Sequence, residues 1–178
     1  MKLLEIFTEC KTQWLKAIEE KDHSFRSFVL STVDINRKPN SRNVILRSFD
    51  SNKLSFTIYT DLRSKKVNDL KNSSSVQLLF YDKTALFQVT VRAELININS
   101  DLNIFNAQPE HSKKNYTSFK PPGVKIDDPY YVPIGKEINF CELTFKALSI
   151  EALYLKKEVN IRSCFNLNDQ WKGFFMTP

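Results

Sequence analysis

The sequence predicts a mainly β protein, an antiparallel β-barrel with a few peripheral α-helices. Many short segments alternate apolar and polar side chains, as half-buried strands do. Short polar turns join neighbouring segments, which favours antiparallel pairing. The chain has 178 residues, 42% of them hydrophobic, which suffices for a single domain over residues 1–178 with its own core. Many antiparallel strands in one domain of this size indicate a barrel.

The chain is expected to begin with a helix and to continue with three strands. Residues 3–20 place apolar side chains on one helical face, and Trp14 on that face is expected to lie in the core. Strands are predicted at residues 26–33, 42–49 and 54–60, separated by polar turns at 34–39 and 50–53. Arg42 and Arg47 are five positions apart, so a regular strand would direct them to opposite faces. Either a bulge lies between them or they serve different parts of a site.

A second helix and two further strands are expected next. The helix is predicted at residues 64–71, where Val67 and Leu70 share a face. An apolar strand at 76–81 precedes a long alternating one, in which Gln88 lies on the wetter face. The opposite face of that strand carries Phe87, Val89, Val91, Ala93 and Leu95.

The last third of the chain is expected to mix a helix, a loop and strands. Residues 100–118 indicate a short helix followed by a polar segment. Four prolines between Lys120 and Gly135 predict a loop without regular hydrogen bonding. Strands are predicted at residues 138–145, 150–155, 160–167 and 171–176.

The start of the second helix has the composition of an anion site. Ser64 is the expected N-cap, and Lys65 and Lys66 then lie in the first turn, where the helix dipole disfavours cations. A bound phosphate would resolve that conflict, because free backbone N–H groups, the dipole and two ammonium groups would all point at it. The alternative is a solvated basic turn with no ligand.

Several function classes lack their signature residues. The three glycines, at positions 123, 135 and 173, form neither a GxGxxG turn nor a P-loop. His23 and His111 are isolated and the three cysteines are widely separated, so no metal site or disulfide framework is expected. The net charge is +6, but the basic residues are dispersed, and neither a membrane span nor a signal peptide is predicted. These features predict a cytoplasmic location and favour neither a nucleic-acid partner nor a membrane partner.

Four motifs between about residues 25 and 98 carry a resemblance to a known family. The motifs, in chain order, are SRNVILRSFD, IYTDLRSKK, VQLLFY and FQVTVRAELI. In these motifs and their order, the chain resembles the pyridoxamine 5'-phosphate oxidase family. The resemblance implies an FMN-binding split β-barrel that forms a homodimer, with FMN at the subunit interface and a small-molecule substrate. An oxidoreductase that transfers hydride at the flavin N5 is therefore expected.

The resemblance also implies residues that contact the cofactor. Lys65 stands where the family usually has arginine, and Lys66 keeps the family lysine of the phosphate clamp. Gln88 matches a glutamine that usually reaches the flavin ring from the other subunit. Near the C-terminus, Tyr154 and either Arg162 or Cys164 fill the positions of a tryptophan and an arginine, depending on register. The implied cofactor-binding residues are Arg42, Asn43, Val44, Ile45, Leu46, Arg47, Tyr59, Thr60, Ser64, Lys65, Lys66, Gln88, Tyr154 and Arg162.

The substrate side departs from the family pattern. In the family, a tyrosine, an arginine and a serine hold the substrate phosphate, and these positions align here with Ile104, Gln108 and Ser112. A later Arg-x-His pair of the family is replaced by Asn160 and Arg162. The substrate is therefore expected to differ from pyridoxine phosphate. Arg47 and Ser112 remain as substrate-binding candidates, and no catalytic side chain is assigned.

Two other functions remain open from the sequence. One is a flavin-binding protein without turnover, for storage or sensing, because the substrate-side residues differ. The other is a basic barrel that binds nucleic acid, since Phe56, Tyr59 and Arg63 combine aromatic and basic side chains.

Overall fold

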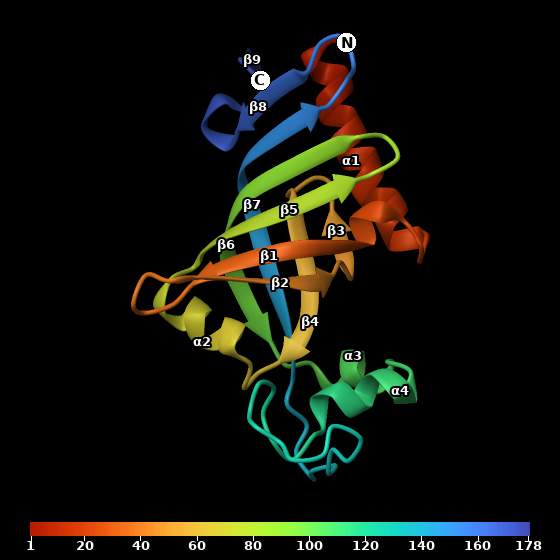
Figure 1. Cartoon of the computed structure of the whole chain (residues 1–178), viewed down its shortest axis with the longest axis vertical. Coiled ribbons are helices and arrows are strands. Elements are labelled where there is room, and N and C mark those ends of the chain that lie inside the picture. Colours follow the sequence, from red (N-terminus) through yellow and green to blue (C-terminus); the bar gives the residue numbers. More distant parts are fainter.

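The computed structural model describes residues 1–178 and shows one antiparallel nine-stranded sheet curled around a core (Figure 1). The strands are β1 (Ser27–Val33), β2 (Pro39–Ile45), β3 (Ser48–Asp50), β4 (Ser55–Asp61), β5 (Ser75–Asp82), β6 (Phe87–Asn99), β7 (Phe140–Tyr154), β8 (Ile161–Asn166) and β9 (Phe174–Met176). The helices are α1 (Leu3–Glu19), α2 (Lys65–Asn72), α3 (Leu102–Asn106) and α4 (Glu110–Lys113). The mainly β class and the antiparallel barrel predicted from the sequence are confirmed.

The barrel is closed by a chain crossing rather than by a continuous ladder. Neighbouring strands follow the order β2-β1-β5-β6-β7-β4-β3. At the crossing, the Leu46 N–H donates to Arg26 O beside β1 at 2.8 Å, and the Arg47 N–H donates to Thr57 O of β4 at 2.8 Å. The predicted strand 42–49 is therefore wrong as one element, because the chain leaves β1 and joins β4 between Leu46 and Arg47.

A second correction concerns β7, which the sequence suggested as two strands. One strand runs from Phe140 to Tyr154, and its first half pairs with β4 while its second half pairs with β8. Ala93 pairs with Ala147 and Arg92 pairs with Ser149, so Leu148 is an extra, bulged residue. The bulge shifts the alternation of buried side chains by one position, which makes one strand resemble two.

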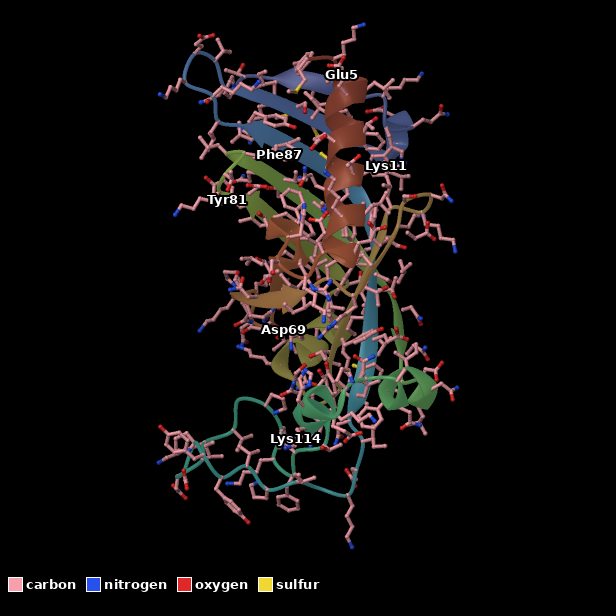
Figure 2. All side chains as sticks on the ribbon, turned by 90° about the vertical axis from the view of Figure 1, so that its right-hand side faces the viewer. Glu5, Lys11, Asp69, Tyr81, Phe87 and Lys114 are labelled. Atoms are coloured by element: carbon pink, nitrogen blue, oxygen red, sulfur yellow. The ribbon has the colours of Figure 1, made fainter.

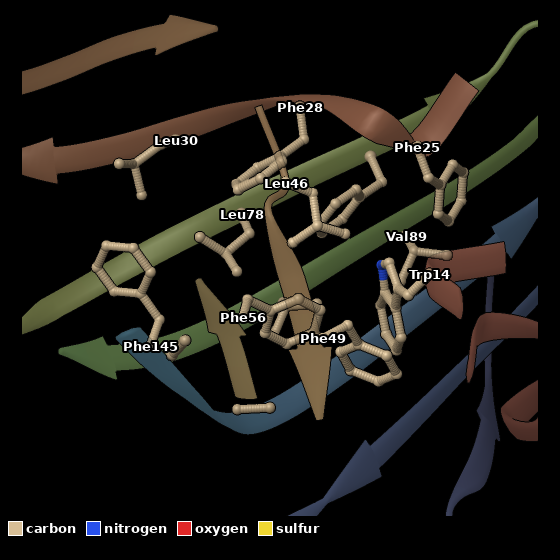
Figure 3. Packing of buried hydrophobic residues seen from close by; sticks show 14 of the residues in the cluster. Trp14, Phe25, Phe28, Leu30, Leu46, Phe49, Phe56, Leu78, Val89 and Phe145 are labelled. Atoms are coloured by element: carbon tan, nitrogen blue, oxygen red, sulfur yellow. The ribbon is translucent and has the colours of Figure 1, made fainter. Parts of the chain in front are cut away.

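Helix α1 packs lengthwise on the barrel and supplies the centre of the core (Figures 2 and 3). Trp14 is completely buried, as predicted, and its ring lies 4.9 Å from the Phe56 ring and 5.1 Å from the Phe49 ring. Phe80 of β5 joins this group at 5.7 Å. Aromatic side chains from α1, β3, β4 and β5 thus fill the space between helix and sheet.

One end of the barrel is covered by less regular chain. The helices α3 and α4 and the segment 117–139 lie at this end (Figure 1), where Phe105, Tyr116 and Phe140 form a small second core. The predicted loop from Lys120 to Gly135 is confirmed and exposed. None of the helices has the length and apolar composition that a membrane crossing requires.

The final strand is shorter than predicted. Gln170, Trp171 and Gly173 have positive φ values of 52°, 62° and 73°, so β9 begins only at Phe174. A Cβ atom on Gly173 would lie 2.3 Å from the Phe165 ring, so this turn requires glycine both for its φ angle and for space.

Candidate functional site

The start of α2 presents backbone and side-chain donors together. Ser64 is the N-cap residue as predicted, but its hydroxyl makes no capping bond and lies 3.3 Å from Thr60 Oγ1. Lys65 and Lys66 are the first helical residues, whose N–H groups have no partner within the helix. The Lys66 Nζ donates to Thr60 Oγ1 at 2.8 Å. Burial, followed by the nearby charge of Arg42, lowers the pKa of the Lys66 ammonium.

Arg42 is held next to this helix start by a buried carboxylate. Its Nη1 donates to Thr32 Oγ1 at 2.8 Å and to Leu30 O at 3.2 Å, and its Nη2 lies 3.6 Å from Asp69 Oδ2. Burial lowers the pKa of the Arg42 guanidinium, and Asp69 opposes that shift. Arg42 thus reaches α2 from β2 as a charged group with a fixed position.

Asp69 connects the remaining members of the cluster. Its Oδ2 accepts hydrogen bonds from Thr32 at 2.6 Å and from the Asn40 Nδ2 at 3.2 Å. Asn40 in turn accepts a hydrogen bond of 2.8 Å from Lys65 Nζ. We call Arg42, Thr60, Ser64, Lys65 and Lys66 the clamp, and Asp69 with Thr32 and Asn40 supports it. The sequence offered no signal for Asp69, because a single acidic residue in a short helix usually faces solvent.

The turn before α2 is fixed by an ion pair. Arg63 binds the buried Asp61 through contacts of 2.7 and 3.1 Å and donates to Ser118 O at 2.9 Å. The hydrogen bond to Asp61 raises the pKa of Arg63. Arg63 therefore ties the helix entrance to the segment that follows α4. The surface suggested for nucleic acid does not form, because Phe56 is fully buried and Arg63 is engaged.

Arg47 lies in different surroundings from Arg42. Its guanidinium carbon is 5.4 Å from the centre of the Tyr59 ring, and its Nε is buried without a hydrogen-bond partner. Burial raises the pKa of Tyr59 and of Tyr116, and the charge of Arg47 opposes both shifts. The break between β2 and β3 thus gives the two arginines different neighbours.

Gln88 and Arg162 share the outer face of the sheet, away from the clamp. Gln88 pairs with Leu153, which pairs with Arg162, so the three residues form one row across β6, β7 and β8. Arg162 contacts Glu151 at 2.8 Å. Gln88 lies six positions before Glu94, which pairs with Ser75 just after the C-terminal end of α2, and six strand positions span about 20 Å. Figure 2 shows this separation through Phe87, the neighbour of Gln88, and Asp69.

The other predicted site residues are spread over several environments. Tyr154 stacks on Phe87 with ring centres 4.1 Å apart and packs against the main core. Leu46 is fully buried, so only its backbone is available to a ligand, whereas Asn43 and Ile45 are exposed and Val44 is half-buried. Ser112 lies on α4, and Gln108 donates to Ile104 O at 3.0 Å.

The cysteines and acidic residues form no further reactive site. Cys141, which pairs with Thr60, is buried, and burial raises the pKa of its thiol to about 11. Such a thiol is inert at neutral pH. No group of three or more His, Cys, Asp or Glu side chains is arranged to hold a metal ion.

Comparisons with known proteins point to one family. The family model of the pyridoxamine 5'-phosphate oxidase FMN-binding domain matches residues 8–99. Pyridoxine/pyridoxamine 5'-phosphate oxidase 2 of Arabidopsis thaliana is 35% identical over 88 residues, which cover 47% of this chain and 44% of that protein. The oxidase of Enterobacter sp. (strain 638) is 35% identical over 104 residues, covering 57% and 47%. The matched region therefore spans less than half the length of these relatives.

Solved structures share the fold over nearly the whole chain. A pyridoxamine 5'-phosphate oxidase-related, FMN binding protein from Nostoc punctiforme PCC 73102 has a TM-score of 0.77 at 18% identity, covering 97% of both chains. PhzG from Burkholderia lata 383 also has a TM-score of 0.77, at 13% identity, covering 96% of this chain and 91% of PhzG. At such identities the likeness shows the fold, a split β-barrel.

Proposed function

Because this chain belongs to the pyridoxamine 5'-phosphate oxidase family of FMN-binding domains, we propose that it binds FMN and acts as an FMN-dependent oxidoreductase. The observation that carries the proposal is the clamp. Lys66 is half-buried, and its ammonium donates one hydrogen bond, to the Thr60 hydroxyl, without an ion pair to a carboxylate. A cation in this position favours an anionic ligand.

The donors of the clamp suit a phosphate monoester. The free N–H groups at the helix start, the two ammonium groups and the Arg42 guanidinium are all charged or charge-assisted donors. Three such hydrogen bonds at about 1.5–3 kcal/mol each, before entropy losses, bring micromolar affinity within reach. The residues present therefore fit the phosphate end of FMN.

The chain's contribution to the reaction is binding and orientation. FMN, when bound, supplies hydride acceptance and donation at its N5 atom. Strand β2 offers the exposed side chains of Asn43 and Ile45 and the backbone of Val44 as a border for the ring system, and Arg47 with its unpartnered Nε supplies a further donor. No side chain is required as a nucleophile.

We propose that the complete site needs two copies of the chain. The row with Gln88 and Arg162 lies about 20 Å along β6 from Glu94, which pairs with Ser75 just beyond the C-terminal end of α2. A single flavin contacts the clamp and this row more readily if they come from different subunits. The proposed assembly is a homodimer in which each FMN is held by the clamp of one copy and faces Gln88 and Arg162 of the other.

The proposed substrate is a small molecule other than pyridoxine phosphate. Ile104 and Gln108 replace a tyrosine and an arginine of the family pattern, and the Gln108 amide already donates to the Ile104 carbonyl of helix α3. The loss of these donors weakens a second phosphate site by several kcal/mol. Arg47 and Ser112 remain at this end of the barrel for a substrate of different shape.

A double substitution tests the cofactor assignment. Lys65→Ala/Lys66→Ala is compared with the control Lys21→Ala/Lys83→Ala, which removes two exposed lysines from turns. The native protein and the control are expected to purify yellow with flavin absorbance. The clamp variant is expected to bind FMN about 100-fold more weakly with unchanged circular dichroism. Equal flavin occupancy in all three proteins would reject the clamp.

A second candidate function is flavin binding without turnover. The altered substrate-side positions Ile104 and Gln108 favour it. Stopped-flow reduction by NADPH and assays with trial amines distinguish the two functions in the flavin-loaded protein. Oxidation and reduction through many cycles supports the oxidoreductase, and the absence of any reduction supports storage or sensing.

A further inference from the structure

The loop at the end of the barrel exposes a group of apolar and aromatic side chains. We call residues 119–135 the proline-rich loop. Tyr130 is 97% exposed and Tyr131 is 70% exposed. Three further apolar side chains of this loop are more than half exposed, namely Phe119, Val132 and Ile134. Monomeric proteins rarely leave a large apolar patch in water, so the loop has the surface of a contact region.

Both ends of the proline-rich loop are fixed beside the clamp. Arg63, in the turn before α2, donates to Ser118 O at 2.9 Å and to Phe119 O at 3.3 Å. The Gly135 N–H donates to Thr117 O at 2.6 Å, which joins the two ends of the loop. Figure 1 shows the loop beyond the end of the barrel, at the opposite end of the molecule from β8 and β9.

That opposite end exposes a surface that matches the loop. It consists of the turn between β7 and β8, residues 155–160, and the adjoining β9. Val159 is 66% exposed, and Phe174 and Phe175 are 47% and 53% exposed. A hollow of about 330 Å³ opens in the turn, lined by Lys156, Lys157, Glu158, Val159 and Ile161. This end therefore offers apolar side chains next to two cations.

The charges of the two surfaces are complementary. Asp127 and Asp128 are consecutive and exposed in the loop, and Lys156 and Lys157 are consecutive and exposed in the turn. None of these four side chains forms an ion pair within the chain. The two lysines of the loop make it neutral as a whole, so the acidic pair rather than the net charge provides the match.

The proposed homodimer brings these two surfaces together. A two-fold axis that places the clamp of one copy against the Gln88 row of the other makes the two chains run in opposite directions. Phe87, Asp69 and Lys114 follow one another along the long axis in Figure 2, so the loop lies beyond the clamp on the side away from the row. The turn between β7 and β8 lies beyond the row at the other end (Figure 1). The loop of one copy therefore reaches the β7–β8 end of the other.

We propose that the proline-rich loop of one copy packs on the β7–β8 turn and β9 of a second copy, with Asp127 and Asp128 facing Lys156 and Lys157. The inference rests on the homodimer of the proposed function. Strand β8 follows the turn directly and carries Arg162, so the contact holds this arginine in place at the flavin site that the first copy provides. Each flavin site is therefore incomplete without the loop.

A charge swap within the full-length chain tests the polar part of the contact. Asp127→Lys/Asp128→Lys and Lys156→Glu/Lys157→Glu each place like charges against one another, and the chain with all four substitutions restores opposite charges. We expect each double variant to weaken the dimer about tenfold at low salt, and the fourfold variant to recover native dimerisation. Sedimentation velocity measures the dissociation constants. Lys21→Glu/Lys53→Glu, in two exposed turns, is the control with the same change of charge.

A second pair of variants tests the apolar part. Tyr130→Ser/Tyr131→Ser is expected to weaken the dimer about tenfold, because it removes the aromatic side chains that the second copy covers. Leu4→Ser, which changes a side chain of α1 that is 75% exposed, is the control. Equal dissociation constants for these two proteins overturn the proposal.

Flavin absorbance of the same samples separates this inference from the proposed function. A native dimer that neither charge swap weakens overturns the loop contact and leaves the shared flavin site standing. A native protein that is monomeric and retains FMN overturns both the contact and the shared site. A loop swap that loses FMN but forms the native dimer assigns the loop to the flavin of its own chain, and this outcome also overturns the contact.

Discussion

Thr32 of β1 donates a hydrogen bond of 2.6 Å to Asp69 of α2, and both residues are buried. This contact joins the barrel wall to the helix that carries Lys65 and Lys66. Because Arg42 also donates to the Thr32 hydroxyl at 2.8 Å, the arginine and the helix share one anchor. A carboxylate near an anion site weakens the attraction for phosphate, but here it fixes the positions of the cations.

Removal of the Asp69 carboxylate is expected to destabilise the fold. Asp69→Ala leaves the Thr32 hydroxyl without its acceptor and Arg42 without its counter-charge, which costs about 2–4 kcal/mol. Asp69→Asn keeps an acceptor for Thr32 and is expected to lose about half as much. Urea unfolding measures both, with the exposed Asp22→Ala as the control. Equal stability of Asp69→Ala and Asp22→Ala would contradict the anchoring role.

The two clamp lysines are expected to contribute unequally to FMN affinity. Lys66 is half-buried, whereas the Lys65 side chain is 63% exposed and its Nζ is 4.0 Å from Asp34. Lys66→Met should therefore weaken FMN binding about 30-fold or more, and Lys65→Met less than about tenfold. Fluorescence titration of flavin-stripped protein gives both values. The reverse order would place the phosphate outside the clamp.

The sequence predicted most strands and helices because their burial follows a regular period. It failed where tertiary hydrogen bonds or an inserted residue interrupt that period. Leu46 and Arg47 lie in a segment that the sequence predicted as one strand, but the Leu46 N–H bonds to Arg26 O beside β1 and the Arg47 N–H bonds to Thr57 O of β4. Leu148 inserts one residue between the inward-facing Ala147 and Ile150, so β7 had the pattern of two strands.

The candidate site was predictable only where residues lie close in sequence. Ser64, Lys65 and Lys66 are consecutive, and their helix position follows from local propensity. Asp69 could not be identified, because its partners Thr32 and Asn40 lie on β1 and β2 and only the fold brings them together. The proposed roles of Gln88 and Arg162 came from the family resemblance, and the structure adds that they share one row.

Two substitutions of Trp14 separate the effect of side-chain volume on the stability of the core from the effect of hydrogen bonding. Trp14 is completely buried, and its Nε1 has no hydrogen-bond partner. Trp14→Ala should cost about 3–5 kcal/mol, because it leaves a cavity among Phe49, Phe56 and Phe80. Trp14→Phe should cost less than about 2 kcal/mol, because it also removes the unpartnered N–H. Thermal and urea unfolding followed by circular dichroism measure the difference, and equal losses would contradict this account.

FMN affinity is expected to depend on pH through Lys66. Burial and Arg42 lower the pKa of its ammonium, whereas a bound phosphate would favour the charged form and raise that pKa again. The affinity for FMN is therefore constant below the pKa that Lys66 has in the ligand-free protein. It falls as the pH rises from that value towards the higher pKa that Lys66 has in the complex. The fall should begin below 10.5, the ordinary value for lysine.

Arginine at the same position provides the control for this pH dependence. A guanidinium stays charged over the whole range, so Lys66→Arg should give a flatter profile of affinity against pH. Lys65→Arg should leave the native profile unchanged, since Lys65 is mostly exposed. Superimposable profiles for native protein and Lys66→Arg would assign the pH dependence to another group.

The shared flavin site predicts complementation between two defective chains. One chain carries Lys65→Ala/Lys66→Ala and the other carries Gln88→Ala/Arg162→Ala. In a mixed dimer, one of the two sites combines both defects and the other is intact, because the clamp and the Gln88 row of each site come from different copies. Dimers purified through two different affinity tags should therefore hold about half the flavin of the native protein, with native affinity at the intact site. If clamp and row acted within one chain, every site in the mixed dimer would be defective, and flavin retention would fall to that of the two homodimers.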